Sequence, residues 1–387
     1  MKKVTIDQIL FRKLTARDRA RRRADWLRWR RSKRIGQATP QASILLDGKR
    51  YRSHGYKGTP LPSVFCLDEN PEETLRAIQE INDKVIAGSM EAKADAAAGR
   101  RRRPKTRTYF DFKTVESMGA SAALILASIY QTGKSITGRR LRTYDEHRWK
   151  PGVVWLLRQL GFHELLEMQP YSRQHRYTGD FAIQPFLSGQ RADGEELGKL
   201  QEALTLLLPD ELREKLLTAE PYGGMLEAIL NSYSWAYPEG HKWGYDVLAN
   251  WWLTGAVDKQ TNTVVVCAYD RGVSIPFSLP LWEHWGMLQS YAQKILRRLK
   301  LSSSLEHSTN DGVALRLAMK IAKTATQLPQ HGKGLHTMVE VAERARYGRL
   351  RILSRYGEYV WETGKRPRSF NHQYPLLGTL VEWHLEL

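Results

Sequence analysis

Three short segments in the C-terminal half constrain this chain more than any other part of its sequence. In the first, Glu227 and Asn231 stand four residues apart, so a helix would place both on one face. In the second, the apolar run 264–268 predicts a strand that leads to Asp270, on a turn with a glycine. In the third, residues 332–335 read Gly-Lys-Gly-Leu and are expected to open a helix, where free N–H groups attract phosphate. Their order and spacing together indicate a nucleotide-binding site.

Length, cysteine content and the absence of long apolar runs indicate how many domains to expect and in which compartment the protein acts. The chain has 387 residues, which is enough for two or three domains. Its two cysteines, Cys66 and Cys267, lie in strand-like apolar stretches, which favours a reducing compartment over a disulfide framework or a zinc cluster. No apolar run approaches the ~20 residues of a membrane span, and no apolar core follows the basic N-terminus as in a secretory signal. We therefore expect a cytoplasmic protein that does not enter the membrane.

Positive charge is concentrated in two places. The formal net charge is +19, and residues 1–40 hold 14 Lys and Arg against three Asp. This segment is predicted to be a basic helical arm, and a second cluster of Lys and Arg lies at residues 100–107. Such asymmetry suggests contact with nucleic acid or another polyanion, and a solvated basic surface remains the alternative.

The region 41–175 is expected to be a first α/β domain, because strand-like and helix-like stretches alternate along it. Asn70 and the proline after it predict the start of a helix. The Ala-, Gly- and Arg-rich residues 87–107 predict that this helix ends in a long loop. An apolar helix is expected over 119–130, and a strand-like stretch follows near 137–143.

The region 176–387 is expected to be a second α/β domain, in which a helical layer covers one face of a mixed sheet. This two-layer α/β sandwich follows from the alternation of amphipathic and apolar stretches along the region. Helices are expected to begin near residues 194, 209, 221 and 334. Strands are expected near 243–254, 262–269, 348–354, 357–363 and 378–387.

Residues 180–387 resemble the GHKL superfamily of ATP-binding domains, which share the Bergerat fold, and most closely its anti-sigma-factor serine kinases. The stretch 226–238 is similar to that group's first box, a helix with an acid and an asparagine that ends in Ala-Tyr-Pro. Residues 332–338 resemble its glycine-leucine helix start, and residues 378–385 resemble its closing strand. The superfamily also includes histidine kinases, gyrase B and MutL. The resemblance implies a pocket for ATP and Mg²⁺ with a helical lid at 277–331.

The resemblance implies a role for each of the main polar residues. Asn231 would be the magnesium ligand, because its amide oxygen suits a hard cation. Glu227 would face the same site and act as the catalytic base that activates water or a serine hydroxyl. Asp270 would accept a hydrogen bond from the adenine amino group, which would explain a carboxylate at the end of an apolar strand.

The resemblance places further residues around the nucleotide. Gly272 would let the backbone approach the base, and Ser274 stands where the family has its second glycine. Trp235 occupies a position that is often His or Lys in related proteins, which implies either a lost phosphate contact or stacking within the core. The residues expected to contact phosphate or the base are Gly332, Lys333, Gly334, Leu335 and Thr379.

Residues 61–170 resemble a STAS domain, the fold of anti-anti-sigma factors. The likeness lies in the strand 109–112, in the segment Val-Glu-Ser-Met-Gly-Ala-Ser-Ala-Ala-Leu at 115–124, and in a later Leu-Gly-Phe. In that family a serine at the start of the helix can accept phosphate, and Ser121 stands near this position. A serine that caps or packs the helix is the alternative interpretation.

Together these features predict a cytoplasmic regulatory protein that binds Mg-ATP and uses it to switch a protein partner. Protein serine kinase and slow ATPase activity both remain open, so the sequence leaves its status as an enzyme undecided. One alternative is an ATP-dependent clamp that binds nucleic acid through residues 1–40 and 100–107. Another is a scaffold with a vestigial pocket. The residues Trp235 and Ser274, which depart from the family pattern, are compatible with this interpretation.

Overall fold

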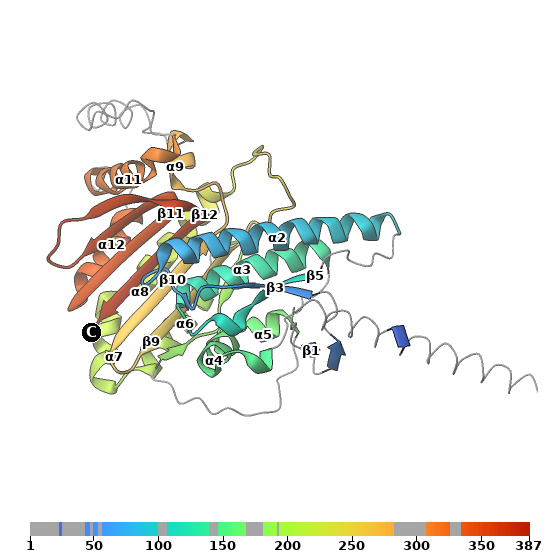
Figure 1. Ribbon diagram of the computed structural model, residues 1–387. Helices are drawn as coiled ribbons and strands as arrows, with labels where there is room; N and C mark the ends of the chain where they lie inside the picture. The colour runs from blue at the N-terminus through green and yellow to red at the C-terminus, as the bar shows by residue number, and fades with distance from the viewer. Residues whose placement is uncertain are drawn as a thin grey trace, which may run out of the picture.

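Helices and strands alternate along the chain, which confirms the expected α/β class (Figure 1). The computed structural model describes residues 23–24, 43–46, 49–52, 56–99, 107–138, 146–167, 181–191, 193–281, 307–325 and 334–387. The predicted arm 1–40 therefore lies outside the described residues apart from Arg23 and Ala24, and so do residues 100–106 of the second basic cluster.

The elements are as follows. The α-helices are α2 (Pro71–Ala97), α3 (Ala120–Thr137), α4 (Pro151–Gln159), α5 (Phe162–Leu165), α6 (Gly194–Leu207), α7 (Asp210–Ala219), α8 (Pro221–Asn231), α9 (Ile275–Ser278), α11 (Asp311–Ala325) and α12 (Gly334–Arg344). The strands are β1 (Ser43–Leu46), β2 (Lys49–Arg52), β3 (Tyr56–Pro60), β4 (Val64–Phe65), β5 (Arg107–Asp111), β6 (Ser117–Met118), β7 (Phe181–Ile183), β8 (Leu187–Gly189), β9 (Trp251–Asp258), β10 (Thr263–Asp270), β11 (Tyr347–Glu362) and β12 (Arg368–Glu386). Short helical turns are η1 (Phe112–Thr114), η2 (Glu146–Arg148), η3 (Ser232–Ala236), η4 (Leu279–Leu281) and η5 (Ser308–Asn310).

A six-stranded sheet occupies the centre of the molecule. Its strands are ordered β11-β12-β10-β9-β7, and β8 also pairs with β9. Every pair described in this sheet is antiparallel, not mixed as the sequence predicted. Short connections join β9 to β10 and β11 to β12, and such hairpins require antiparallel pairing. β11 and β12 are single long strands of 16 and 19 residues, whereas separate shorter strands were expected.

The central strands bury side chains on both of their faces. In β10, Val264, Val266 and Ala268 belong to one core, while Val265 and Cys267 belong to the other. Successive side chains of a strand point to opposite faces, so a strand without polar positions suits a sheet that is covered on both sides. Helices of 176–387 cover one face of the sheet, as expected, and the region before residue 176 covers the other, so the sheet is the middle of three layers.

Helices form the two outer layers (Figure 1). α6, α8, α11 and α12 pack on one face of the sheet, while α2 and α3 pack on the other. The N-terminal segment, expected to be a STAS-like domain, thus shares a core with Trp252 and Tyr269 of the central sheet. Within the described residues, strands β1 to β6 form only two-stranded sheets. We call the layer that contains α2 and α3 the N-terminal layer.

Two helices of the N-terminal layer are longer than the sequence predicted. α2 continues to Ala97, so residues 87–97 are helical where a loop was expected. This stretch is rich in Ala and also contains Met, Glu and Lys, which are strong helix formers. α3 continues to Thr137, where a strand-like stretch was expected to begin, and ends at Gly138.

Part of the predicted lid belongs to the packed core. Leu315, Leu317 and Ala318 of α11 are buried with the side chains of the helical layer opposite the N-terminal layer. This helix is therefore an integral part of the sandwich. Residues 282–306 and 326–331 of the predicted lid lie outside the described residues.

Gln131 connects α3 to the sheet. Its amide oxygen accepts a hydrogen bond from the Trp252 indole N–H on β9, and its amide nitrogen donates to Ser188 Oγ on β8 at 3.1 Å. Trp252 is fully buried, so water cannot replace this contact. The N-terminal layer and the sheet therefore behave as one structural unit.

We predict that Gln131→Leu lowers the free energy of unfolding by about 1–3 kcal/mol, because it leaves the buried indole N–H without a partner. Urea unfolding followed by tryptophan fluorescence and by far-UV circular dichroism measures this change. Both probes should report one shared transition in the wild type and in the variant. An earlier, separate transition of the N-terminal layer would contradict the single unit.

Candidate functional site

A pocket opens where the end of β10 meets the end of α8 and the first turn of α12. It encloses an empty volume of about 560 Å³, part of which is open to solvent. All three sequence segments contribute to its lining, as do α9 and β12. The lining residues are Ala228, Asn231, Ser232, Trp235, Ala236, Ala268, Asp270, Ser274, Ile275, Ser278, Leu335, Met338, Thr379 and Val381.

The first and third sequence segments lie against each other. A side-chain carbon built on Gly334 would lie 2.5 Å from Glu227 Oε2 and 3.2 Å from Asn231 Nδ2. Glycine therefore lets the start of α12 approach these two side chains without displacing the Glu227 carboxylate. The described part of α12 begins at Gly334, so the backbone of its first described turn lies beside these two side chains.

The two polar side chains of α8 are available for chemistry. Asn231 Nδ2 is buried and has no hydrogen-bond partner among the described residues. The two ends of a side-chain amide are interchangeable, so Asn231 can present either its oxygen or its nitrogen to a ligand. Burial raises the pKa of Glu227, which makes its carboxylate a stronger base than that of an exposed glutamate.

Asp270 lines the pocket from the end of β10 and is only 6% exposed. The Gly272 N–H donates a hydrogen bond to its Oδ1 at 2.8 Å, and Ser232 Oγ donates to its Oδ2 at 3.2 Å. Burial nevertheless raises the pKa of Asp270 to about 6. The Thr379 backbone N–H also donates to this carboxylate, and burial outweighs all three donors, so a ligand that donates a further hydrogen bond would stabilise its charge.

Gly272 packs against the turn that follows α8. A side-chain carbon on this glycine would lie 2.3 Å from the carbonyl oxygen of Ala236. Residues 232–236 form a π-helical turn, a feature that is frequent at functional sites. This turn carries Ser232 and Trp235 into the pocket lining. The second sequence segment therefore meets the end of the first.

Three further predicted residues, Leu335, Ser274 and Thr379, also line the pocket. Leu335 supplies an apolar wall at the start of α12, and Ser274 lies at the start of α9. Thr379 Oγ1 lies 2.8 Å from Ser354 Oγ. Sequence reasoning missed Ser232 and Ser354, because each pairs with a residue far away in the chain and no local pattern marks such pairs.

Six predicted residues are not part of the pocket lining that the structure describes. Glu227, Gly272 and Gly334 are described and lie close to lining residues, but they do not line the pocket themselves. Gly332 and Lys333, expected at the phosphates, lie outside the described residues. Ser121, the proposed phosphoacceptor, is the second residue of α3 and is only 4% exposed. A buried hydroxyl cannot reach a kinase site while α3 is packed, so the position of Ser121 favours the alternative of a packing serine.

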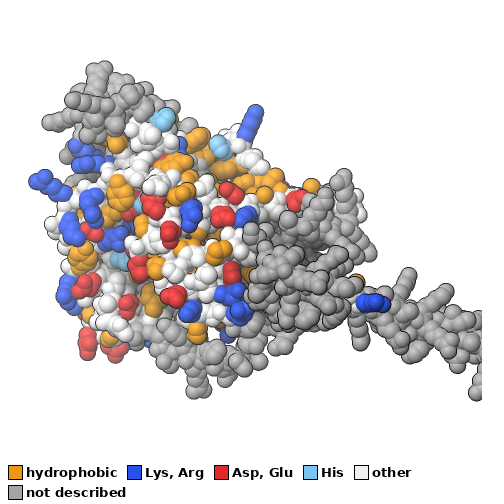
Figure 2. Space-filling view, in the orientation of Figure 1, with side chains coloured by type: hydrophobic (Ala, Val, Ile, Leu, Met, Phe, Trp, Pro, Cys, Tyr) orange, Lys and Arg blue, Asp and Glu red, His pale blue; other side chains and the backbone are white. Residues whose placement is uncertain are grey.

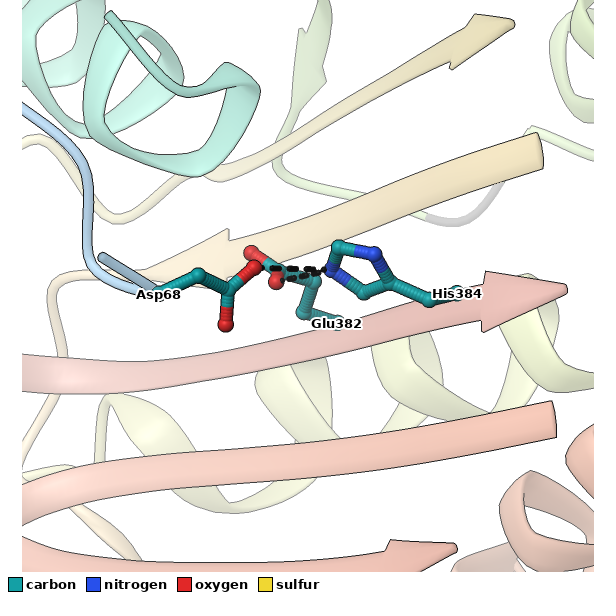
Figure 3. A group of neighbouring side chains, drawn as sticks. All are labelled: Asp68, Glu382 and His384. Atoms are coloured by element: carbon teal, nitrogen blue, oxygen red, sulfur yellow. Dashed lines mark hydrogen bonds and ion pairs between the residues drawn. The ribbon is translucent and has the colours of Figure 1, made fainter. Parts of the chain in front are cut away.

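A second cluster of titratable groups lies on the other face of β12 (Figure 3). Asp68, Glu382 and His384 each offer one ligand atom, and these atoms lie within 4.8 Å of one another. His384 Nε2 lies 3.2 Å from Asp68 Oδ2 and also contacts Glu382 Oε1. Burial disfavours the charged imidazole, but the carboxylates of Glu382 and Asp68 outweigh it and raise the pKa of His384 to about 9. With two carboxylates against one imidazole and Arg351 beside them, we interpret the cluster as an ion-pair network.

Arg351 lies at the centre of this ion-pair network. Its Nη1 lies 2.9 Å from Asp68 Oδ1, and its Nε lies 3.1 Å from Glu358 Oε1. Its Nη2 donates to the Leu67 carbonyl oxygen at 2.7 Å. Because Leu67 and Asp68 precede α2 whereas Arg351 and Glu358 belong to β11, the network holds the N-terminal layer on the sheet.

The ion-pair network predicts a decline of stability at alkaline pH. The pKa of His384 is about 9 in the folded state and lies near 6.5 in an unfolded chain, so its contribution is complete below pH 6.5 and is lost as the pH rises through 9. We expect the free energy of unfolding to fall by on the order of 2 kcal/mol over this range. Urea unfolding at several pH values measures the slope. His384→Gln should flatten it, and an unchanged slope in this variant would contradict the assignment.

The described surface shows no concentration of one charge on the face that carries α2. Figure 2 shows Lys and Arg side chains interspersed with Asp and Glu on the described part of this face. The predicted contacts with nucleic acid fall at residues 1–40 and 100–107, nearly all of which lie outside the described part of the chain. The described part of this face thus adds no support for a nucleic-acid clamp.

Comparisons with protein-family models, with curated proteins and with solved structures find no match for this chain. Among the helices of the described residues, none combines the length and the apolar character that crossing a membrane requires. The pocket must therefore be interpreted from its own geometry and chemistry.

Proposed function

We propose that the pocket binds Mg-ATP and that binding switches the contacts of the protein with a partner. The observation that carries the proposal is the close approach of Gly334 to Glu227 and Asn231. It brings an acid and an amide together with the start of α12, beside a pocket whose lining includes Asn231 and a buried aspartate. A helix N-terminus attracts phosphate, and Asp270 attracts a hydrogen-bond donor, so the lining suits a nucleotide with an amino group on its base.

Asn231 would hold the magnesium ion. Its amide nitrogen is buried and has no partner among the described residues, so turning the amide would place the oxygen there, free for a hard cation. A bound magnesium ion would neutralise charge on the phosphates and favour transfer of the terminal phosphoryl group. The N–H groups at the start of α12 would hold the phosphates beside it.

Glu227 would act as the catalytic base. Its raised pKa makes it a better proton acceptor, and its Oε2 lies next to the start of α12, where the phosphates would bind. The proton acceptor can serve water, which gives an ATPase, or a serine hydroxyl, which gives a kinase. The burial of Ser121 makes a serine in a partner protein the better acceptor of phosphate than a serine of α3.

Arg271 offers a route from the pocket to the N-terminal layer. It directly follows Asp270, is only 2% exposed, and donates from Nη2 to Asn82 Oδ1 of α2 at 2.6 Å. The same nitrogen also lies 3.2 Å from Tyr245 Oη. A nucleotide that moves the end of β10 would therefore shift α2, which could change the contacts of the protein with a partner.

Gly334→Ala tests the close approach of the two helices. The new methyl group would displace the Glu227 carboxylate and hold a ligand away from α12, so we expect Mg-ATP affinity to fall by about tenfold or more, as for a lost hydrogen bond to a charged group. Alanine favours helix, so the melting temperature should not fall. Calorimetric titration and thermal unfolding measure the two effects.

Gly198→Ala is the matched control, because this α6 glycine has open space around it. It should change helix stability in the same direction as Gly334→Ala and leave Mg-ATP binding at the wild-type level. Equal nucleotide affinity in the wild type and in Gly334→Ala would contradict the proposed position of the phosphates.

The raised pKa of Asp270 leads us to expect that the affinity of the pocket for a base depends on pH. An ionised carboxylate accepts a hydrogen bond from an amino group more strongly than a protonated one, so the affinity for adenosine should rise as the pH increases through about 6. Adenosine is the chosen ligand because it has no phosphate that titrates in this range. Asp270→Asn should bind about tenfold more weakly at pH 7 and show no such rise. A flat wild-type profile between pH 5 and 7.5 would argue against base binding at Asp270.

A further inference from the structure

Ser274 has a backbone conformation that glycine normally adopts. Its φ is 79° and its ψ is 155°. This combination lies outside the small left-handed region that other residues sometimes occupy, and it is strained for any residue with a side chain. Glycine at this position would therefore be more stable for the folded protein than serine.

The Ser274 hydroxyl makes none of the contacts that would compensate for this strain. Ser274 precedes α9 as its N-cap residue, but its side chain does not cap the helix. The first N–H of α9, that of Ile275, donates instead to Ser354 Oγ at 2.9 Å. Ser274 Oγ is buried, has no hydrogen-bond partner among the described residues, and belongs to a residue that is only 6% exposed.

Neighbouring hydroxyl groups in the pocket are already engaged. Ser232 donates to Asp270, Ser278 donates to the Ile275 carbonyl oxygen, and Thr379 pairs with Ser354. A buried hydroxyl without a partner is unfavourable, and its partner is expected to be a ligand or ordered water when the protein itself supplies none.

We infer that Ser274 determines which base the pocket accepts, by donating a hydrogen bond from its hydroxyl to a ring nitrogen of the base. This inference rests on the proposed nucleotide site. Asp270 lines the same pocket and would accept from an exocyclic amino group, so the two side chains together fit an amino group flanked by a ring nitrogen. Adenine has this arrangement at its six-membered ring. Guanine and hypoxanthine carry a carbonyl oxygen at the corresponding carbon, and that oxygen would face the Asp270 carboxylate as a second acceptor.

Deaza analogues of ADP test the inference in the full chain. The analogues are 1-deaza-ADP and 7-deaza-ADP, in which a C–H group replaces N1 of the six-membered ring or N7 of the five-membered ring, the ring nitrogens nearest the amino group on either side, so one hydrogen-bond acceptor is lost. Calorimetric titration should show that the wild type binds one of these analogues about tenfold more weakly than ADP. Ser274→Ala and Ser274→Gly should bind ADP about as weakly as the wild type binds that analogue, and should not discriminate between ADP and the analogue.

Thermal unfolding without nucleotide distinguishes a hydrogen bond from Ser274 to the base from a purely structural role of this serine. Ser274→Gly should raise the melting temperature, because it removes both the backbone strain and the unpaired hydroxyl. Higher stability together with weaker ADP binding is the expected combination, and a merely structural serine would not produce it. Ser234→Ala, which removes an exposed hydroxyl outside the pocket lining, should keep wild-type discrimination.

The outcomes distinguish this inference from the proposed function. If the wild type binds ADP but Ser274→Ala and Ser274→Gly discriminate against both analogues as the wild type does, the role of Ser274 is refuted and the nucleotide site stands. If the wild type binds neither ADP nor its analogues, the proposed function fails and the inference fails with it. Should Ser274→Ala not fold, the less strained Ser274→Gly still gives the decisive comparison.

Discussion

The burial of both faces of the central antiparallel sheet is the constraint on which the rest of this structure depends. Along β12 the side chains alternate, so Thr379 and Val381 face the pocket while Glu382 and His384 face the N-terminal layer. The pocket and the ion-pair network are thus built on opposite faces of the same strand. A change in the packing of the N-terminal layer would reach the pocket through this strand and through Arg271.

The pocket contains polar groups that the described protein does not fully satisfy. The Asn231 amide nitrogen and the Ser274 hydroxyl are buried without partners among the described residues, and burial raises the pKa of Asp270. Each of these features lowers the stability of the folded state when no ligand is bound. Their position in one pocket, beside the N-terminus of a helix, is the physical argument for a polar ligand that carries both phosphate and a hydrogen-bonding base.

The sequence predicted the elements that local patterns specify. The helix starts near residues 194 and 221 and the strand that ends at Asp270 lie where the pattern of apolar residues indicated. The continuous apolar run 264–268 is typical of a strand in a sheet that is covered on both faces. Buried strands of several other folds have the same pattern, so the run alone does not specify this architecture. The third layer, the Ser232–Asp270 hydrogen bond and the strain at Ser274 depend on contacts between distant segments, which no local pattern records.

The most direct test of the account is a crystal structure of the full chain with Mg²⁺ and a non-hydrolysable ATP analogue. The account predicts electron density for the base against Asp270 and Ser274, with the phosphates at the start of α12 and magnesium at the Asn231 amide. Density for the nucleotide elsewhere, or an empty pocket at saturating ligand, would contradict the central claim.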